Sequence, residues 1–350
     1  MKKRVQSSGS IQALGIFLLS RWHRYRPVMS MWFLTVLSAF LTQAAECGQG
    51  DDSEMKRRPQ GILTGMPFMA HVSSRSFVDD AGHRIYLAKP PARVVSLAPS
   101  ITEMLFSLGL DDQIVGVTDF CDYPDAAKSK ARVGYSNPST EALIALRPEL
   151  VLAPKDFLRP DLQTKLDQLK IPLFVLDAQT LEDILLQIQT LGKMFEKTSA
   201  ANEVTQRMRQ RIVEIRRKVE TLPARRVLYV LNSRPLIAVG PGSFIHPMIG
   251  LAGGVNIAAR AGVAYPKLSM ETVLKEDPEV LIFPSETVPR SEQQQWLRWD
   301  SLSAVKLRRF HEVSSSLLNR PGPRIIEGLE QLARAIHPET FGSGEGAVHP

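Results

Sequence analysis

The sequence predicts two α/β lobes, each built on a parallel sheet, joined by one long helix. Three observations point to this fold class. Residues 198–221 have the 3.6-residue apolar period of a helix and contain neither glycine nor proline. On both sides of this segment, short β-rich runs alternate with amphipathic helical runs, which is the pattern of parallel sheets covered on both faces. One motif also occurs twice in the same relative place, which favours a duplicated lobe.

The predicted long helix carries one continuous apolar stripe. Its apolar residues recur every three or four positions: Val204, Met208, Ile212, Ile215 and Val219. Ser199 is expected to cap its start and Pro223 to stop it. A rise of about 1.5 Å per residue gives the helix a length of about 34 Å, the width of a small domain. We expect it to act as a rigid strut on which both lobes pack, so that the lobes move little when ligand binds.

Residues 76–197 are predicted to form the N-terminal α/β lobe. A hairpin at 76–89 turns at Asp80-Ala81-Gly82 and precedes the first sheet. Strands are predicted at 93–97, 114–117, 150–153 and 173–176, alternating with helices at 101–108, 139–146, 159–169 and 180–195. Ser100 and Glu103 have the spacing of a capping box at the start of the first of these helices.

The pattern restarts after the backbone helix, which is assigned to 198–222, and residues 223–340 are predicted to form a C-terminal α/β lobe. A strand at 226–230 corresponds to 93–97, and a helix at 243–251 corresponds to 100–108. The clearest match aligns 139–156 with 269–286 and pairs Ser139 with Ser269, Glu141 with Glu271, Pro148 with Pro278 and Glu149 with Glu279. A last amphipathic helix is predicted at 323–336, and 341–350 is expected to be a disordered tail.

The N-terminal segment 1–45 has the composition of an export signal. It contains six Lys or Arg and no Asp or Glu, and its apolar runs cover 11–20 and 28–45. It is a cleaved signal peptide or, because the second run is just long enough to span a bilayer, a retained membrane segment. Cys47 follows Glu46 rather than a small residue, so the lipoprotein signal is weak. Residues 46–75 are polar and aperiodic and are predicted to be a flexible linker.

Charge and motifs exclude several function classes. The formal net charge is +7, but removing the six basic residues of the leader leaves +1, so nucleic-acid binding is not indicated. The sequence lacks a phosphate-binding P-loop, a serine-nucleophile elbow and a zinc-protease motif. Its seven histidines are scattered, so no catalytic and no metal residues are predicted, and His246 and His311 are expected to be packed or solvated. The two cysteines, Cys47 and Cys121, are not expected to form a disulfide.

The candidate ligand site lies in the loops that follow the strands, because open parallel sheets bind ligands at the carboxyl ends of their strands. Aromatic rings with a few polar groups suit a mid-sized, partly apolar ligand. The alternatives are that the aromatic residues anchor their loops and that Cys121 is a small buried apolar residue. The candidates are Phe120, Cys121, Asp122 and Tyr123 in the loop 118–124, together with Tyr135, Lys155, Tyr265 and Arg320.

Glu141 and Glu271 begin short helices at the same place in each lobe. One interpretation is that each glutamate only stabilises its own helix, through a favourable interaction with the helix dipole worth less than about 1 kcal/mol. The functional alternative is that two equivalent acidic points, one on each lobe, meet a twofold-symmetric partner that carries basic residues. The duplication favours the functional reading.

Four segments carry a resemblance to a known family: RVVSLAPSITEMLFSLGL (93–110), VGVTDFCDYP (115–124), ALRPELVLA (145–153) and NRPGPRIIEGLEQLARAI (319–336). Between 93 and 336 the chain resembles the periplasmic substrate-binding proteins of ABC importers, in the class with a single backbone helix that binds cobalamin, haem or iron siderophores. The resemblance implies two Rossmann-like lobes with parallel sheets joined by one long rigid helix, the helical-backbone type of metal receptor.

The resemblance also implies roles for individual residues. The family's two permease-docking glutamates fall on Glu141 and Glu271, and its cobalamin contacts fall on Tyr123, Tyr265 and Arg320. Where the cobalamin type has tryptophans in the wall of its site, this chain has Tyr135, Lys155 and Tyr265, and approximately Leu317.

The resulting expectation is an exported, monomeric, periplasmic solute-binding protein and not an enzyme. It captures a metal chelate, above all cobalamin or a related corrinoid, between its lobes and delivers it to an ABC permease dimer with ATPase subunits. The chelate is its cargo, and no intrinsic cofactor is expected. The alternatives are a haem or ferric-siderophore binding protein, a metal-chelate enzyme, and a membrane-anchored interaction module.

Overall fold

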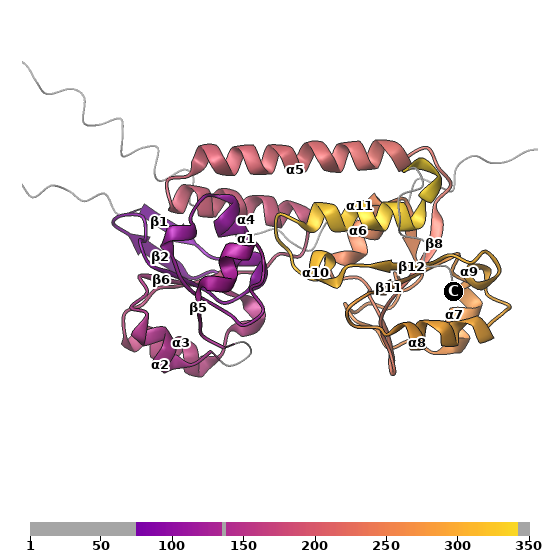
Figure 1. Cartoon of the computed structure of the whole chain (residues 1–350), viewed down its shortest axis with the longest axis horizontal. Helices are drawn as coiled ribbons and strands as arrows, with labels where there is room; N and C mark the ends of the chain where they lie inside the picture. Colours follow the sequence, from indigo (N-terminus) through magenta and orange to yellow (C-terminus); the bar gives the residue numbers. More distant parts are fainter. Residues whose placement is uncertain (1–74, 135–137, 342–350) are drawn as a thin grey trace, which may run out of the picture. The chain divides into compact units, whose positions relative to one another are not determined.

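A computed structural model of the chain describes residues 75–134 and 138–341. Every described residue belongs to one compact unit. The predicted leader, Tyr135, the tail from 342 and all but residue 75 of the predicted linker lie outside the described residues. The described part is a mixed α/β structure with two five-stranded sheets (Figure 1).

The first sheet is entirely parallel, with the strand order β5-β4-β3-β6-β7. Neighbouring residues of β3 belong to different core clusters, Val94 to one and Val95 to another, because both faces of the sheet are covered. The antiparallel hairpin of β1 (Arg75–Val78) and β2 (Arg84–Leu87) precedes the sheet. The other elements are β3 (Val94–Ser96), α1 (Pro99–Ser107), β4 (Ile114–Val117), β5 (Ala131–Arg132), α2 (Thr140–Ala145), β6 (Leu150–Pro154), α3 (Pro160–Gln168), β7 (Leu173–Leu176) and α4 (Leu181–Met194).

The second sheet has four parallel strands in the order β10-β8-β11-β12, and β9 pairs antiparallel with β8. The residues of β8 also alternate between two core clusters, so this sheet is covered on both faces as well. The α/β class with parallel sheets is therefore confirmed. The elements are β8 (Arg225–Ser233), β9 (Leu236–Ala238), α6 (Ile245–Leu251), β10 (Gly254–Asn256), α7 (Met270–Glu276), β11 (Val280–Pro284), α8 (Arg290–Gln294), α9 (Ser303–Lys306), β12 (Phe310–Val313), α10 (Ser315–Leu318) and α11 (Ile325–Ile336).

The long helix α5 (Thr198–Val219) lies alongside α4 and α11 (Figure 1). Its predicted stripe is buried at Val204, Met208, Ile215 and Val219, and these residues belong to the same core cluster as residues from both sheets. Close packing against α4 depends on a glycine, since a side chain at Gly192 would collide with the Cβ of Ala201. The helix thus joins the cores of the two sheets through one apolar face.

Two capping predictions are wrong. The N-cap of α5 is Lys197 rather than Ser199, because the turn from α4 closes tightly, with the Lys197 amide donating to the Gly192 carbonyl at 2.7 Å. The N-cap of α1 is Ala98, and no side chain caps that helix. The Glu103 carboxylate instead accepts hydrogen bonds from Arg324.

His311 in β12 provides a pH-dependent contribution to stability. Its Nε2 is buried without a hydrogen-bond partner among the described residues, and burial, together with Arg309 and Arg225, lowers its pKa from 6.5 to about 4. Between these two pH values the unfolded chain binds more protons than the folded one, so stability falls as the pH drops from 6.5 to about 4. We expect His311→Leu to lose less stability than the wild type over this range in urea unfolding. Parallel pH profiles for the two proteins would contradict this assignment.

Among the helices of the described ranges, none combines the length and the apolar character needed to cross a bilayer.

Candidate ligand and docking sites

The loop after β4 presents two exposed aromatic rings. Phe120 is 55% exposed and Tyr123 is 46% exposed, whereas Thr118 and Cys121 of the same loop are buried. The guanidinium of Arg324 lies 3.8 Å from the centre of the Tyr123 ring, a cation–π contact that fixes the orientation of the ring. An exposed ring held by a cation is available for contact with a ligand.

Two arginines from the segment 319–324 reach the elements around the first sheet. Arg320 pairs with Asp122, with Nη1 at 2.5 Å from Oδ1, and this hydrogen bond holds the pKa of the Asp122 carboxyl below its usual value. Arg324 donates to Glu103 of α1 from Nε at 3.0 Å and from Nη2 at 2.8 Å. Only 2% of the Glu103 side chain is exposed, so this fork is a buried ion pair.

The backbone of the same segment lies against α1. A Cβ at Gly322 would lie 3.2 Å from the carbonyl oxygen of Ser100, so the close approach favours glycine at this position. The segment 319–324, which precedes α11, therefore contacts the start of α1 and the loop after β4. This contact brings together Asp122, Tyr123 and Arg320 from the predicted set.

Tyr265 and Lys155, two further residues of the predicted ligand contacts, lie in other loops. The Tyr265 ring is 55% exposed, and partial burial and the nearby charge of Asp156 raise the pKa of its hydroxyl. Asp156 follows β6, so Tyr265, which precedes α7, lies within electrostatic reach of the carboxyl end of a strand in the first sheet. Lys155 is paired with Asp177 at 2.8 Å, and this hydrogen bond raises the pKa of its ammonium group.

Two predicted contacts belong instead to the interior. Cys121 has no exposed surface, and its Sγ lies 3.2 Å from the Thr102 hydroxyl and 3.1 Å from the Thr118 hydroxyl. Leu317 in α10 is 8% exposed. We therefore assign both to the core and leave them out of the ligand contacts. Tyr135 lies outside the described residues.

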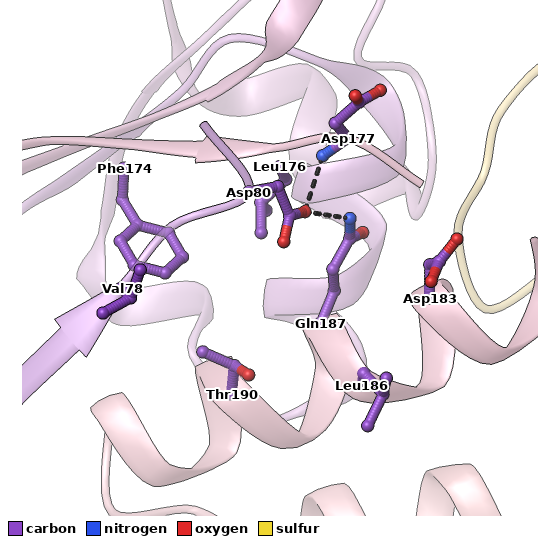
Figure 2. Close-up of a pocket in the computed structure, with 9 residues that line it drawn as sticks. All are labelled: Val78, Asp80, Phe174, Leu176, Asp177, Asp183, Leu186, Gln187 and Thr190. Carbon is purple, nitrogen blue, oxygen red and sulfur yellow. Dashed lines mark hydrogen bonds between the residues drawn. The ribbon is translucent and has the colours of Figure 1, made fainter. Parts of the chain in front are cut away.

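A cavity of about 90 Å³ lies between β1, β7 and α4 (Figure 2). The Asp80 carboxylate at its wall already accepts hydrogen bonds from the Asp177 amide and from Gln187, both at 2.7 Å. Mid-sized ligands need pockets of about 300 Å³ or more, so this cavity is too small for a metal chelate. It contains none of the predicted ligand contacts. In the described ranges, no group of three or more His, Cys, Asp or Glu side chains is arranged to hold a metal ion.

The segments around Glu141 and Glu271 have the same local structure in both halves of the chain. Ser139 accepts a hydrogen bond from the Ala142 amide at 3.2 Å, and Ser269 accepts one from the Thr272 amide at 3.1 Å. A residue in the left-handed region follows each helix: Arg147, with φ 45°, comes directly after the C-cap of α2, and Asp277, with φ 44°, is the C-cap of α7. Both glutamates are exposed. The Glu141 pKa is lowered by hydrogen bonds from its own amide and from the Ser139 hydroxyl.

Two arginines that the sequence did not single out hold these helices. Arg93 donates from Nη2 to the Leu146 carbonyl at 2.7 Å, and Arg226 donates from Nε to the Asp277 carbonyl at 2.7 Å. Each therefore satisfies a carbonyl at the end of a short helix. Both arginines stand at the start of a predicted strand, and this equivalent position is the sequence signal that could have identified them. The pairing between strand and helix end was not readable from sequence spacing.

Comparison with known proteins decides the family. The periplasmic binding protein family model matches residues 94–314. The chain belongs to this family. Its members bind substrates and are not enzymes, and what they carry is cargo rather than a resident cofactor.

Two relatives and one solved structure are similar to this chain over most of its length. The vitamin B12-binding protein of Vibrio cholerae is 32% identical over 250 residues, which cover 70% of this chain and 90% of the relative. An uncharacterised ABC transporter substrate-binding lipoprotein, YvrC of Bacillus subtilis, is 30% identical over 273 residues, or 75% and 86% of the two chains. The crystal structure of periplasmic vitamin B12 binding protein BtuF of Vibrio cholerae is similar with a TM-score of 0.64 and 29% identity, covering 71% of this chain and 98% of that one.

Proposed function

We propose that this periplasmic binding protein captures cobalamin or a related corrinoid between its two lobes and delivers it to an ABC permease dimer with ATPase subunits. The observation that carries the proposal is the contact of the segment 319–324 with the loop after β4, which presents Tyr123 and Arg320 together. Similarity to a vitamin B12-binding protein supports the same ligand class. The ligand contacts in this proposal are Phe120, Asp122, Tyr123, Lys155, Tyr265 and Arg320.

The charge state of the candidate site favours a corrinoid over a strongly anionic chelate. Carboxylate and catecholate ligands are bound best by arginines and lysines that offer their hydrogen bonds to the ligand. Here Arg320 is paired with Asp122, Arg324 with Glu103, and Lys155 with Asp177. A haem propionate or ferric siderophore would compete with these carboxylates for the same cationic groups. Exposed rings such as Tyr123 and Tyr265 can contact a large, mostly uncharged ring system without such displacement.

Delivery requires that the protein work outside the cytoplasm. We propose that residues 1–45 direct export to the periplasm, that 46–75 serve as a linker, and that the protein acts as a monomer. Glu141 and Glu271 are then the two points that dock on the permease, one on each lobe. Their matched local structure, with a serine cap before each helix and an arginine at its end, supports a pair of equivalent contacts.

Tyr265 provides a test of the ligand site. Tyr265→Ala should weaken cyanocobalamin binding about tenfold in calorimetry, the effect of losing one well-placed aromatic contact of about 1.4 kcal/mol. Tyr86→Ala is the matched control, because Tyr86 is 64% exposed in β2 and is no candidate for ligand contact. Equal affinities for the Tyr265→Ala protein and the wild type would remove Tyr265 from the site.

A further inference from the structure

Each short helix that bears a docking glutamate also exposes an aliphatic side chain. Ile144 in α2 is 38% exposed, and Leu274 in α7 is 37% exposed. Each follows its glutamate by three positions, and Ile144 aligns with Leu274 in the same register that aligns Glu141 with Glu271. Residues three apart share a helix face, so each glutamate lies beside an exposed aliphatic group.

The two faces are matched in burial as well as in sequence. Leu143 and Val273, between the glutamate and the aliphatic residue, are both fully buried and anchor the helix to its sheet. A single exposed leucine on a protein surface is ordinary and carries no argument. Two that recur at equivalent places, each beside an exposed acid, are a paired surface of the kind that a partner with two equivalent subunits recognises.

We propose that Ile144 and Leu274 complete the two docking points, and that each point is a composite of one glutamate and one aliphatic side chain. This inference rests on the proposed delivery to a permease dimer. The partner is that dimer, with each subunit offering a basic residue beside an apolar surface. Charge complementarity identifies the basic residue, and the duplication identifies the twofold partner.

Charge and apolar area have different tasks in such a contact. An exposed ion pair contributes little affinity in water, is screened by salt, and mainly accelerates and orients the encounter. Burial of an aliphatic side chain contributes affinity that does not depend on ionic strength in this way. The composite surface therefore predicts two separable components of binding, one sensitive to salt and one insensitive.

The local structure keeps this surface in place before binding. Arg93 and Arg226 hold the ends of α2 and α7, and Ser139 and Ser269 hold their starts. A contact that is already ordered loses less conformational entropy on association. Both aliphatic groups are therefore presented rigidly and not on mobile loops.

The test measures binding of the full chain to the permease–ATPase complex in nanodiscs by surface plasmon resonance at low and at high salt. The variants are Ile144→Ser, Leu274→Ser and the double variant, with Leu186→Ser as control, since Leu186 is 51% exposed on α4. We expect each single change to weaken binding about fivefold and the double change about twenty-fivefold, at both salt concentrations. The control should bind like the wild type.

Three results would overturn the inference. The first is wild-type affinity of the double variant at both salt concentrations, which would leave the proposed glutamate contacts standing. The second is an equal loss of affinity in the Leu186→Ser control. If the wild type itself fails to bind the complex, the proposed delivery is wrong, and the composite surface falls with it. Ligand titration of the double variant should match the wild type, since neither residue lies among the proposed ligand contacts.

Discussion

Reversing the charge of both proposed docking glutamates, Glu141→Lys with Glu271→Lys, should abolish transport of the ligand while leaving its affinity for the free protein unchanged. Both side chains are exposed on short helices, so the change removes no buried contact. A basic partner residue would then face a lysine at each point, and like charges placed together cost several kcal/mol across an interface. The measurement is ATP-dependent uptake of labelled ligand in proteoliposomes, beside calorimetry on the same preparations.

A matched control separates docking from net charge. Asp112→Lys with Glu203→Lys makes the same change in net charge at two exposed acidic residues that lie on neither α2 nor α7. This protein should support transport at the wild-type rate. Full transport by the Glu141 and Glu271 double variant would refute the docking assignment, even if ligand binding behaved as expected. Equal loss in both proteins would mean that overall charge, rather than these two residues, governs the encounter.

Breaking the buried ion pair between Glu103 and Arg324 should produce the largest loss of stability. Glu103→Gln keeps the volume of the side chain but leaves the Arg324 guanidinium without this counter-charge. The Arg324 side chain is 18% exposed. Removing one partner of a buried pair costs about 3–5 kcal/mol. Because the arginine is partly exposed, we expect the free energy of unfolding to fall by about 3 kcal/mol. Urea unfolding measures it. The pair joins α1 to the segment before α11, so the loss should also loosen that contact.

Two further variants make this prediction specific. Glu103→Leu with Arg324→Met replaces the pair by apolar groups of similar size and should recover most of the stability, because no unpaired charge is left inside. Glu182→Gln removes an exposed pair with Arg209 and should change stability by less than about 1 kcal/mol. A Glu103→Gln protein as stable as the Glu182→Gln control would show that the Glu103–Arg324 pair does not hold the two segments together.

The large elements were predictable because their signals are local. The helix α5 and the strands β4 and β7 follow from apolar spacing alone, and β4 and β7 have the predicted bounds. Shorter elements such as β5 and β10 were missed, since two or three residues do not make a period. The capping prediction at Ser100 failed for a different reason: Pro99 stands in the first turn of α1, so Ala98 caps the helix, and the Glu103 carboxylate binds an arginine 221 residues away.

For the candidate site, the sequence predicted the position of some residues and not the contacts between them. Exposed rings at Tyr123 and Tyr265 could be placed because loops after strands are the expected position of a ligand. The burial of Cys121 is the second of the two alternatives that the sequence offered. Its contacts with the hydroxyls of Thr102 and Thr118 were not readable, because they are set by the packing of α1 against the loop after β4. Pairing of Arg93 with the end of α2 likewise joins residues that are remote in the sequence.

The central claim is tested most directly by calorimetric titration of residues 46–350 with cyanocobalamin, haem and a ferric siderophore. The structure predicts one cyanocobalamin per chain and clearly weaker binding of the two anionic chelates, because Arg320, Arg324 and Lys155 are already paired with carboxylates. Tighter binding of haem or of the siderophore than of cyanocobalamin would contradict the corrinoid assignment, and the absence of binding to all three would contradict the proposed ligand class.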